Sequence, residues 1–115
     1  MNIVFYGKRK QPVLEFIEKL PTQDRAKTAA CLKSIEELGF ASPRVGFRQI
    51  SGKLWEIKIR SISGGYRVFY VTLKSSTLVL LHAYQKKSQK APIKEIEIAE
   101  KRMLEVIHDE SYYVK

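Results

Sequence analysis

The chain has 115 residues, of which 44% are hydrophobic and 29% are charged. This length and composition support one hydrophobic core and exclude a disordered chain, so we expect residues 1–115 to form a single domain. The formal net charge is +9, and residues 44–94 hold eleven Lys and Arg residues against one acidic residue, Glu56. Such a local excess of positive charge favours nucleic acid as a partner over a merely solubilising surface.

Several features narrow the class of protein further. The sequence has no apolar run long enough to cross a bilayer, and Met1 leads directly into an apolar strand instead of a signal segment. Its single cysteine, Cys31, has no internal disulfide partner, and no Cys and His residues show metal-ligand spacing. We therefore expect a cytoplasmic protein without membrane association, metal or other cofactor.

The N-terminal third predicts one strand followed by two helices. Residues 2–6 form a short apolar strand, and Pro12 is tolerated in the first turn of a helix with apolar residues at helical spacing. Thr22 is suited to cap a second helix, which Gly39 ends. We expect these two helices to form a helical hairpin that covers a sheet.

Four strands and one helix are predicted for the rest of the chain. The strands cover residues 45–50, 54–60, 66–73 and 77–84, and the last two are nearly all apolar, as in a central hairpin. Pro92 begins the last helix, and residues 109–115 are expected to fray. The predicted fold class is α+β, a single antiparallel sheet with an N-terminal helical hairpin and a C-terminal helix, in the order βααββββα.

Charged residues on the predicted strands are the first candidates for a site. Lys58 and Arg60 lie two residues apart, so they project from one face, which alternation predicts to be solvated together with Glu56. Arg67 lies within an apolar strand, where a charge is costly unless it is paired or used. Two interpretations stay open: Arg67 pairs with Glu56, or Arg67 and Arg60 hold a phosphate through bidentate hydrogen bonds.

The end of the last strand carries a second group of candidates. Tyr84 directly precedes Lys86 and Lys87, and this combination offers a ring for base stacking beside ammonium groups that neutralise a nucleic-acid backbone. His82 is flanked by apolar residues, so we expect a packed, hydrogen-bonded histidine, with a general base as the second interpretation. The further expected RNA-binding residues are Lys58, Arg48 and Lys90.

Four motifs follow one another in the second half of the chain. They are the strand Trp55–Arg60, the strand Tyr66–Tyr70, the apolar strand with lysines Leu78–Pro92, and the helical segment Ala99–Arg102. This ordered set resembles the phage-derived Gp49-like, HigB-type branch of the RelE toxin superfamily. One departure is Ala91, where such sequences often carry threonine, and it weakens a helix cap without touching the chemistry.

The resemblance implies a RelE-like fold and the toxin of a type II toxin–antitoxin system. Such a toxin is an endoribonuclease that cuts mRNA, usually on the ribosome, and it is neutralised by a cognate antitoxin, here expected to be of the helix-turn-helix type. Arg67 matches the strand arginine implicated in transition-state stabilisation. Arg60, Tyr84, Lys86 and Lys87 fall where the family keeps its remaining basic and aromatic site residues.

The expected chemistry uses the 2′-hydroxyl of the RNA as the nucleophile, without a metal. It then requires a proton acceptor, a proton donor and cations around the phosphorane oxygens. Crowded positive charges disfavour the protonated form of a lysine, so Lys86 or Lys87 is the candidate base.

Two other functions are alternatives to this one. A non-catalytic protein that binds RNA or the ribosome and blocks translation would need the same basic face. A DNA-binding regulator is disfavoured, because the sequence has no visible helix-turn-helix and its charge lies on strands.

Overall fold

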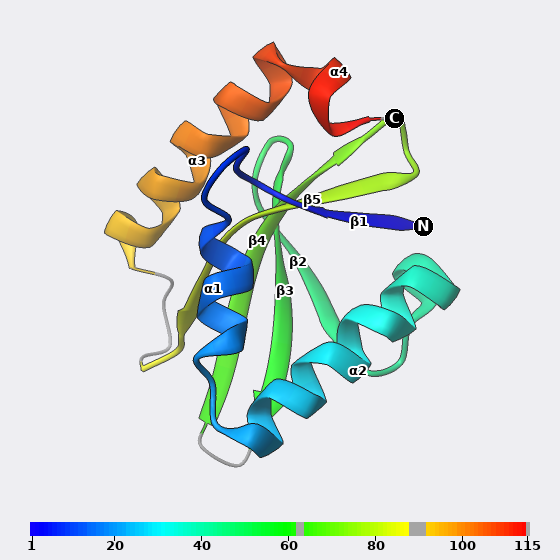
Figure 1. Cartoon of the computed structure of the whole chain (residues 1–115), viewed down its shortest axis with the longest axis vertical. Helices are drawn as coiled ribbons and strands as arrows, with labels where there is room; N and C mark the ends of the chain where they lie inside the picture. The colour runs from blue at the N-terminus through cyan, green and yellow to red at the C-terminus, as the bar shows by residue number, and fades with distance from the viewer. Residues whose placement is uncertain (62–63, 88–91, 115) are drawn as a thin grey trace.

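The computed structural model describes residues 1–61, 64–87 and 92–114 (Figure 1). Within this part of the chain, five strands form one sheet in the order β1-β5-β4-β3-β2, with helices packed on both faces. The predicted α+β class is confirmed. The strands are β1 (Asn2–Phe5), β2 (Gly46–Ser51), β3 (Leu54–Ser61), β4 (Gly64–Leu73) and β5 (Thr77–Gln85).

The direction of β1 corrects the prediction of a wholly antiparallel sheet. Strand β1 runs parallel to β5, with Asn2 opposite Thr77 and Phe5 opposite Leu80, whereas β2 to β5 pair antiparallel. Parallel strands need a long crossover connection, which the helices that follow β1 help to provide. A short apolar strand fits the edge of a sheet in either direction, and its sequence alone does not specify which.

Helices α1 (Pro12–Glu18) and α2 (Thr22–Leu38) cover one face of the sheet. In Figure 1 they diverge from their connection, so the expected helical hairpin is instead an open V. Their apolar residues pack on the inward residues of the central strands. This first core comprises Val13, Ile17, Cys31 and Ile35 of the helices and Ile57, Ile59, Tyr66, Val68, Tyr70, Leu78, Leu80 and Ala83 of the strands.

Helices α3 (Ile93–His108) and α4 (Glu110–Tyr113) pack on the opposite face. The second core comprises Leu54, Phe69, Val71, Leu73, Val79 and Leu81 with Ala99, Val106 and Tyr113. No helix in the described part of the chain is long and apolar enough to cross a membrane.

The fraying predicted for residues 109–115 is wrong for the segment that forms α4. Tyr113 is buried, and its hydroxyl accepts a hydrogen bond from the backbone N–H of Gly7 at 3.1 Å. The aromatic ring ties down a tail whose other residues are mostly polar. Lys115 lies outside the described residues.

A bulge in β5 changes the face of the sheet on which the later side chains of this strand lie. Phe69 lies opposite His82 and Tyr70 lies opposite Leu80, so Leu81 is an extra residue in the strand. The Leu81 carbonyl accepts a hydrogen bond from Arg102 Nη1 of α3 at 2.9 Å. The apolar run of β5 contributes side chains to both cores. Because the bulge shifts the alternation of side chains by one residue, Tyr84 packs against the second core.

Candidate functional site

The strand registers place the candidate residues in two neighbouring rows on the second face. In the first row, Lys58 of β3 lies opposite Arg67 of β4, which lies opposite Tyr84 of β5. In the second row, Arg60 lies opposite Gly65, whose carbonyl accepts a hydrogen bond from the Lys86 N–H at 2.8 Å. Residues from three strands therefore converge at one end of the sheet.

A cavity of about 680 Å³ opens at this end, lined by Arg60, Ser61, Gly64, Gly65, Arg67, Lys86 and Lys87. We call this cavity the cationic cleft. It brings together four of the five predicted catalytic residues, and the fifth, Tyr84, lies beside Arg67 on the neighbouring strand. Of the described residues that line it, four are cations and none is acidic. An anion such as a phosphate is the ligand that this lining favours.

The carboxylate of Glu56 lies under the cationic cleft and is fully buried, which corrects its predicted solvation. Its Oε1 lies 3.1 Å from Arg48 Nη2 and 3.5 Å from Arg67 Nε, and the Tyr84 hydroxyl donates to Oε2 at 3.4 Å. The partners that surround the carboxylate offset the cost of removing it from water, which the alternation of β3 does not reveal.

The pairing of Arg67 with Glu56 is confirmed, whereas phosphate binding by Arg67 and Arg60 stays a prediction. The Arg67 side chain is 11% exposed and also lines the cationic cleft. Its Nη1 donates to the Tyr66 carbonyl at 3.3 Å. These contacts fix the position of the guanidinium, so that a bound phosphate would meet an oriented charge.

Gly65 gives the Arg67 guanidinium its space. A Cβ atom at this position would lie 3.2 Å from Arg67 Nη1 and 3.3 Å from the Ile59 carbonyl oxygen. These distances are tighter than ordinary van der Waals contacts, so a side chain would displace the guanidinium or the strand. Sequence reasoning placed Gly65 in a loop and missed this role.

The cluster of charges alters the proton affinity of two of its members. The pKa of Lys86 lies below its ordinary value of 10.5, first because the ammonium loses hydration and then because Arg67, Lys58 and Arg48 repel it. Burial, followed by the charge of Glu56, raises the pKa of Tyr84 to about 12. The site thus pairs an amine that loses its proton more readily with a phenol that remains a hydrogen-bond donor.

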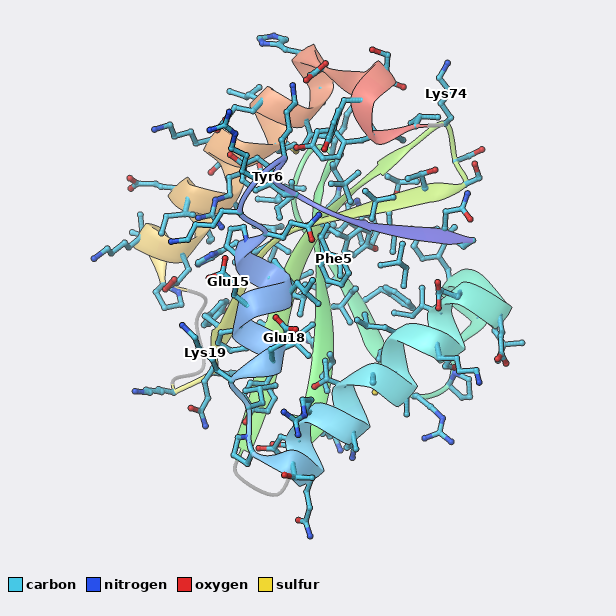
Figure 2. All side chains as sticks on the ribbon, in the orientation of Figure 1. Phe5, Tyr6, Glu15, Glu18, Lys19 and Lys74 are labelled. Atoms are coloured by element: carbon cyan, nitrogen blue, oxygen red, sulfur yellow. The ribbon has the colours of Figure 1, made fainter. Side chains whose placement is uncertain are left out.

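Other expected RNA-binding residues lie near the cationic cleft or outside the described chain. Lys58 is half-buried in the row of Arg67, Arg48 is engaged with Glu56, and Lys90 lies outside the described residues. Lys74 projects from the β4–β5 turn at the far end of the sheet (Figure 2). The basic stretch of the sequence is therefore only partly gathered in space.

His82 is packed and hydrogen-bonded, as predicted. Its ring stacks on Phe69 at a centroid distance of 6.3 Å, and its Nε2 lies 2.6 Å from Glu95 Oε1. Arg102 Nη1 lies 3.3 Å from His82 Nδ1 and also holds the bulge. Sequence reasoning placed Arg102 in a motif but missed Glu95, which carries no signal beyond an acidic residue in a first helical turn.

In residues 1–61, 64–87 and 92–114, no group of three or more His, Cys, Asp or Glu side chains is placed to hold a metal ion. The cationic cleft would bind its ligand through nitrogen donors. Guanidinium and ammonium groups are the side chains that proteins use for phosphate.

Residues 15–104 match the family described as Phage derived protein Gp49-like (DUF891). The chain belongs to this family, and the match includes every residue that lines the cationic cleft. No curated protein matches the chain. The Gp49-like part of the sequence resemblance is thereby confirmed, whereas the RelE-like topology and the wider RelE and HigB relationship stay predictions.

Proposed function

We propose that this protein is the toxin of a type II toxin–antitoxin system, a metal-independent endoribonuclease that cuts mRNA on the ribosome and so inhibits translation. The observation that carries the proposal is the cationic cleft, in which Arg67, oriented by the buried Glu56, lies with Arg60, Lys86 and Lys87. Membership of the Gp49-like family, which the sequence resemblance links to toxins, supports the same function.

The reaction that fits this cleft begins at the 2′-hydroxyl of the RNA. The neutral Lys86 amine accepts the hydroxyl proton while O2′ forms a bond to the adjacent phosphorus. Arg67 and Arg60 stabilise the negative charge that develops on the phosphorane oxygens. The P–O5′ bond then breaks, and the Lys87 ammonium gives a proton to the departing O5′. The products are a 2′,3′-cyclic phosphate and a 5′-hydroxyl.

The lowered pKa of Lys86 supports its role as the base, because more of the amine is then neutral at physiological pH. Even so, a lysine is a modest base near neutrality. Precise orientation of the 2′-hydroxyl for in-line attack supplies much of the rate in such a reaction. Dependence on the ribosome follows, since a ribosome would hold the mRNA in the reactive geometry.

The proposed partners are the mRNA, the ribosome and a cognate antitoxin, and the proposed location is the cytoplasm, where translation occurs. An exposed cluster of positive charge in a free toxin calls for an inhibitor that presents an acidic or otherwise complementary surface. Such an antitoxin would cover the cationic cleft or displace α3 beside it.

A non-catalytic protein that blocks the ribosome is the second candidate, because binding alone needs the same cations. Two features favour catalysis over simple binding. Simple phosphate binding does not require that a buried carboxylate orient the Arg67 guanidinium. The lowered pKa of Lys86 would weaken phosphate binding, because the lysine loses its positive charge more readily. Both features are useful when charge develops during a reaction.

Programmed ribosomes carrying a defined mRNA test the proposal. The purified protein is added at a Mg²⁺ concentration just sufficient for ribosome integrity, and the RNA ends are mapped. Cleavage should leave a 2′,3′-cyclic phosphate or a 3′-phosphate. Ends with a 3′-hydroxyl would contradict this mechanism, and a translation block with intact mRNA would support the non-catalytic alternative.

A further inference from the structure

A second pocket, of about 380 Å³, adjoins the cationic cleft. Lys87 lines both cavities, so a ligand in one would lie next to a ligand in the other. Phe16 of α1, Tyr84 and Gln85 of β5, and Glu95 of α3 contribute to its wall. We call it the side pocket. Apart from Lys87, the residues of the side pocket take no part in the reaction described above.

The side pocket lies along an edge of β5 that β1 does not reach. The last pair between these strands is Phe5 with Leu80, so within the described chain β1 leaves the end of β5 uncovered. The Lys86 N–H points toward β4, where it meets the Gly65 carbonyl. Because backbone groups alternate in direction along a strand, those of Ala83 and Gln85 point toward the opposite edge, where the side pocket lies.

Two aromatic rings of the side pocket are held in place by packing. Phe16 meets Tyr66 edge to face at a centroid distance of 5.9 Å, and Tyr84 stacks on Phe69 at 5.6 Å. Rings that are fixed in this way lose little freedom when a planar ligand binds. Aromatic side chains beside a cationic groove are the usual surface for a base of single-stranded RNA.

Glu95 supplies an acceptor at the wall of the side pocket. Its Oε1 lies 2.6 Å from His82 Nε2, and its side chain is 23% exposed. Among the described residues, His82 is the side-chain partner recorded for this carboxylate, and it engages Oε1, which leaves Oε2 as the acceptor for a ligand. An ionised carboxylate accepts hydrogen bonds and donates none, so it selects ligands that present donors.

We propose that the side pocket binds the base of a nucleotide next to the cleaved phosphate and that Glu95 makes it prefer guanine. The guanine edge presents N1–H and the 2-amino group side by side, and a carboxylate accepts from both. Adenine and cytosine place a ring acceptor beside their amino group, and uracil places carbonyls on both sides of its N–H. This inference rests on the proposed function, because it takes RNA as the ligand.

The test measures the rate of cleavage of an mRNA on programmed ribosomes. It compares guanosine with inosine, whose base lacks the 2-amino group, at each position of the cut codon. The wild-type protein should cut the guanine substrate about tenfold faster at one position, because a hydrogen bond to a charged group is lost with inosine. Glu95→Gln should bring this ratio close to one. Glu100→Gln removes an exposed charge from the same helix and should keep the ratio.

Phe16→Leu provides a second variant that keeps an apolar side chain against Tyr66. It should slow cleavage for every base about tenfold, through the loss of stacking, and retain the preference for guanine over inosine. This result remains informative if Glu95→Gln does not fold, which circular dichroism would detect. Equal cutting of guanine and inosine by the wild-type protein would overturn the inference and leave the proposed function intact.

If the wild-type protein cuts no RNA, the proposed catalysis fails and the side pocket is tested by binding. Fluorescence anisotropy with labelled hexaribonucleotides that differ only in guanine or inosine measures the same preference. A guanine preference that Glu95→Gln removes would support the side pocket as a base-binding site. Equal affinities would overturn it.

Discussion

The two faces of the sheet bury their residues in different ways. Under α1 and α2, the strands present aliphatic and aromatic side chains such as Ile57, Ile59 and Val68, all buried. On the face under α3, the apolar residues give way to Glu56, Lys58 and Arg67 toward the end of the sheet. One face is sealed by packing, whereas the other is held at this end by a buried carboxylate and the arginines that pair with it.

This difference indicates which part of the sheet is not explained by stability alone. A buried ion pair is often no more stabilising than well-packed apolar residues of similar volume, because desolvation offsets the attraction. The cluster around Glu56 therefore makes little sense as a device for stability alone. It makes sense if Arg67 must remain charged, oriented and accessible from the cationic cleft.

Arg67→Ala should have the largest effect on the rate of cleavage, because it removes the oriented charge and leaves the opposite face of the sheet unchanged. We expect the rate of mRNA cleavage to fall about a hundred- to a thousandfold, as for the loss of one transition-state donor. Glu56 would keep Arg48 and Tyr84 as partners, so the fold should persist. A cleavage assay and circular dichroism on the same variant measure both effects. A fully folded variant with undiminished cleavage would contradict the role of Arg67.

Glu56→Gln should lower the free energy of unfolding by about 3 kcal/mol, because it leaves the largely buried Arg67 without its charged partner. The matched control is Ile57→Val, the next residue on β3 but on the opposite face, which should cost about 1 kcal/mol. Urea denaturation measures both. Glu56→Gln should also slow cleavage by the folded protein, and Ile57→Val should not. Equal effects on cleavage would mean that Glu56 only contributes packing.

Lys58→Met should move the pH dependence of cleavage. The Lys58 charge lowers the pKa of Lys86, so its removal raises that pKa toward the ordinary value of 10.5. If neutral Lys86 is the base and the Lys87 ammonium is the acid, the rate rises with pH as Lys86 becomes neutral and falls once Lys87 loses its proton, and the rising limb should shift to higher pH in the variant. At neutral pH the rate should fall by a few fold. Single-turnover rates between pH 6 and 10 test this, and an unchanged profile would exclude Lys86 as the titrating base.

The smallest expected effect is on RNA binding alone: replacing Lys87 and Lys90 by Gln should reduce its dependence on salt concentration, whereas cleavage would also lose the proposed proton donor. For single-stranded RNA, the slope of log K against log salt concentration should fall by about 0.7 for each phosphate contact that is lost. Lys53→Gln with Lys74→Gln is the control, because Lys74 lies at the far end of the sheet and Lys53 lies in the β2–β3 turn. An equal change in both double variants would show a diffuse charge effect instead of defined contacts.

Much of the fold was predictable because it rests on local patterns. The alternation in β3 and the apolar stripe of α1 depend on neighbouring residues, and both predicted their elements with ends close to those observed. The direction of β1 and the anchoring of Tyr113 depend on partners far away in the chain. No local pattern carries that information.

The cations of the site were predictable from the sequence, but the residues that hold them in position were not. The chain order of Arg60, Arg67 and Lys86 sufficed to suggest one cleft, because their strands were expected to be adjacent. The burial of Glu56 and the space left by Gly65 arise only when three strands are assembled. The bulge at Leu81 is hidden in an apolar run, where a shift of one residue leaves no trace.

The two ends of the chain meet in the folded protein, and this has a consequence for its synthesis. Strand β1 pairs with β5, and the N–H of Gly7 bonds to the Tyr113 hydroxyl in the last helix. The contacts of residues 2–7 are therefore complete only after residue 113 has been synthesised. Contacts so far apart in sequence close slowly, since loop closure precedes any gain from pairing. The residues of the cationic cleft are thus synthesised before the contacts of residues 2–7 with Tyr113 can form.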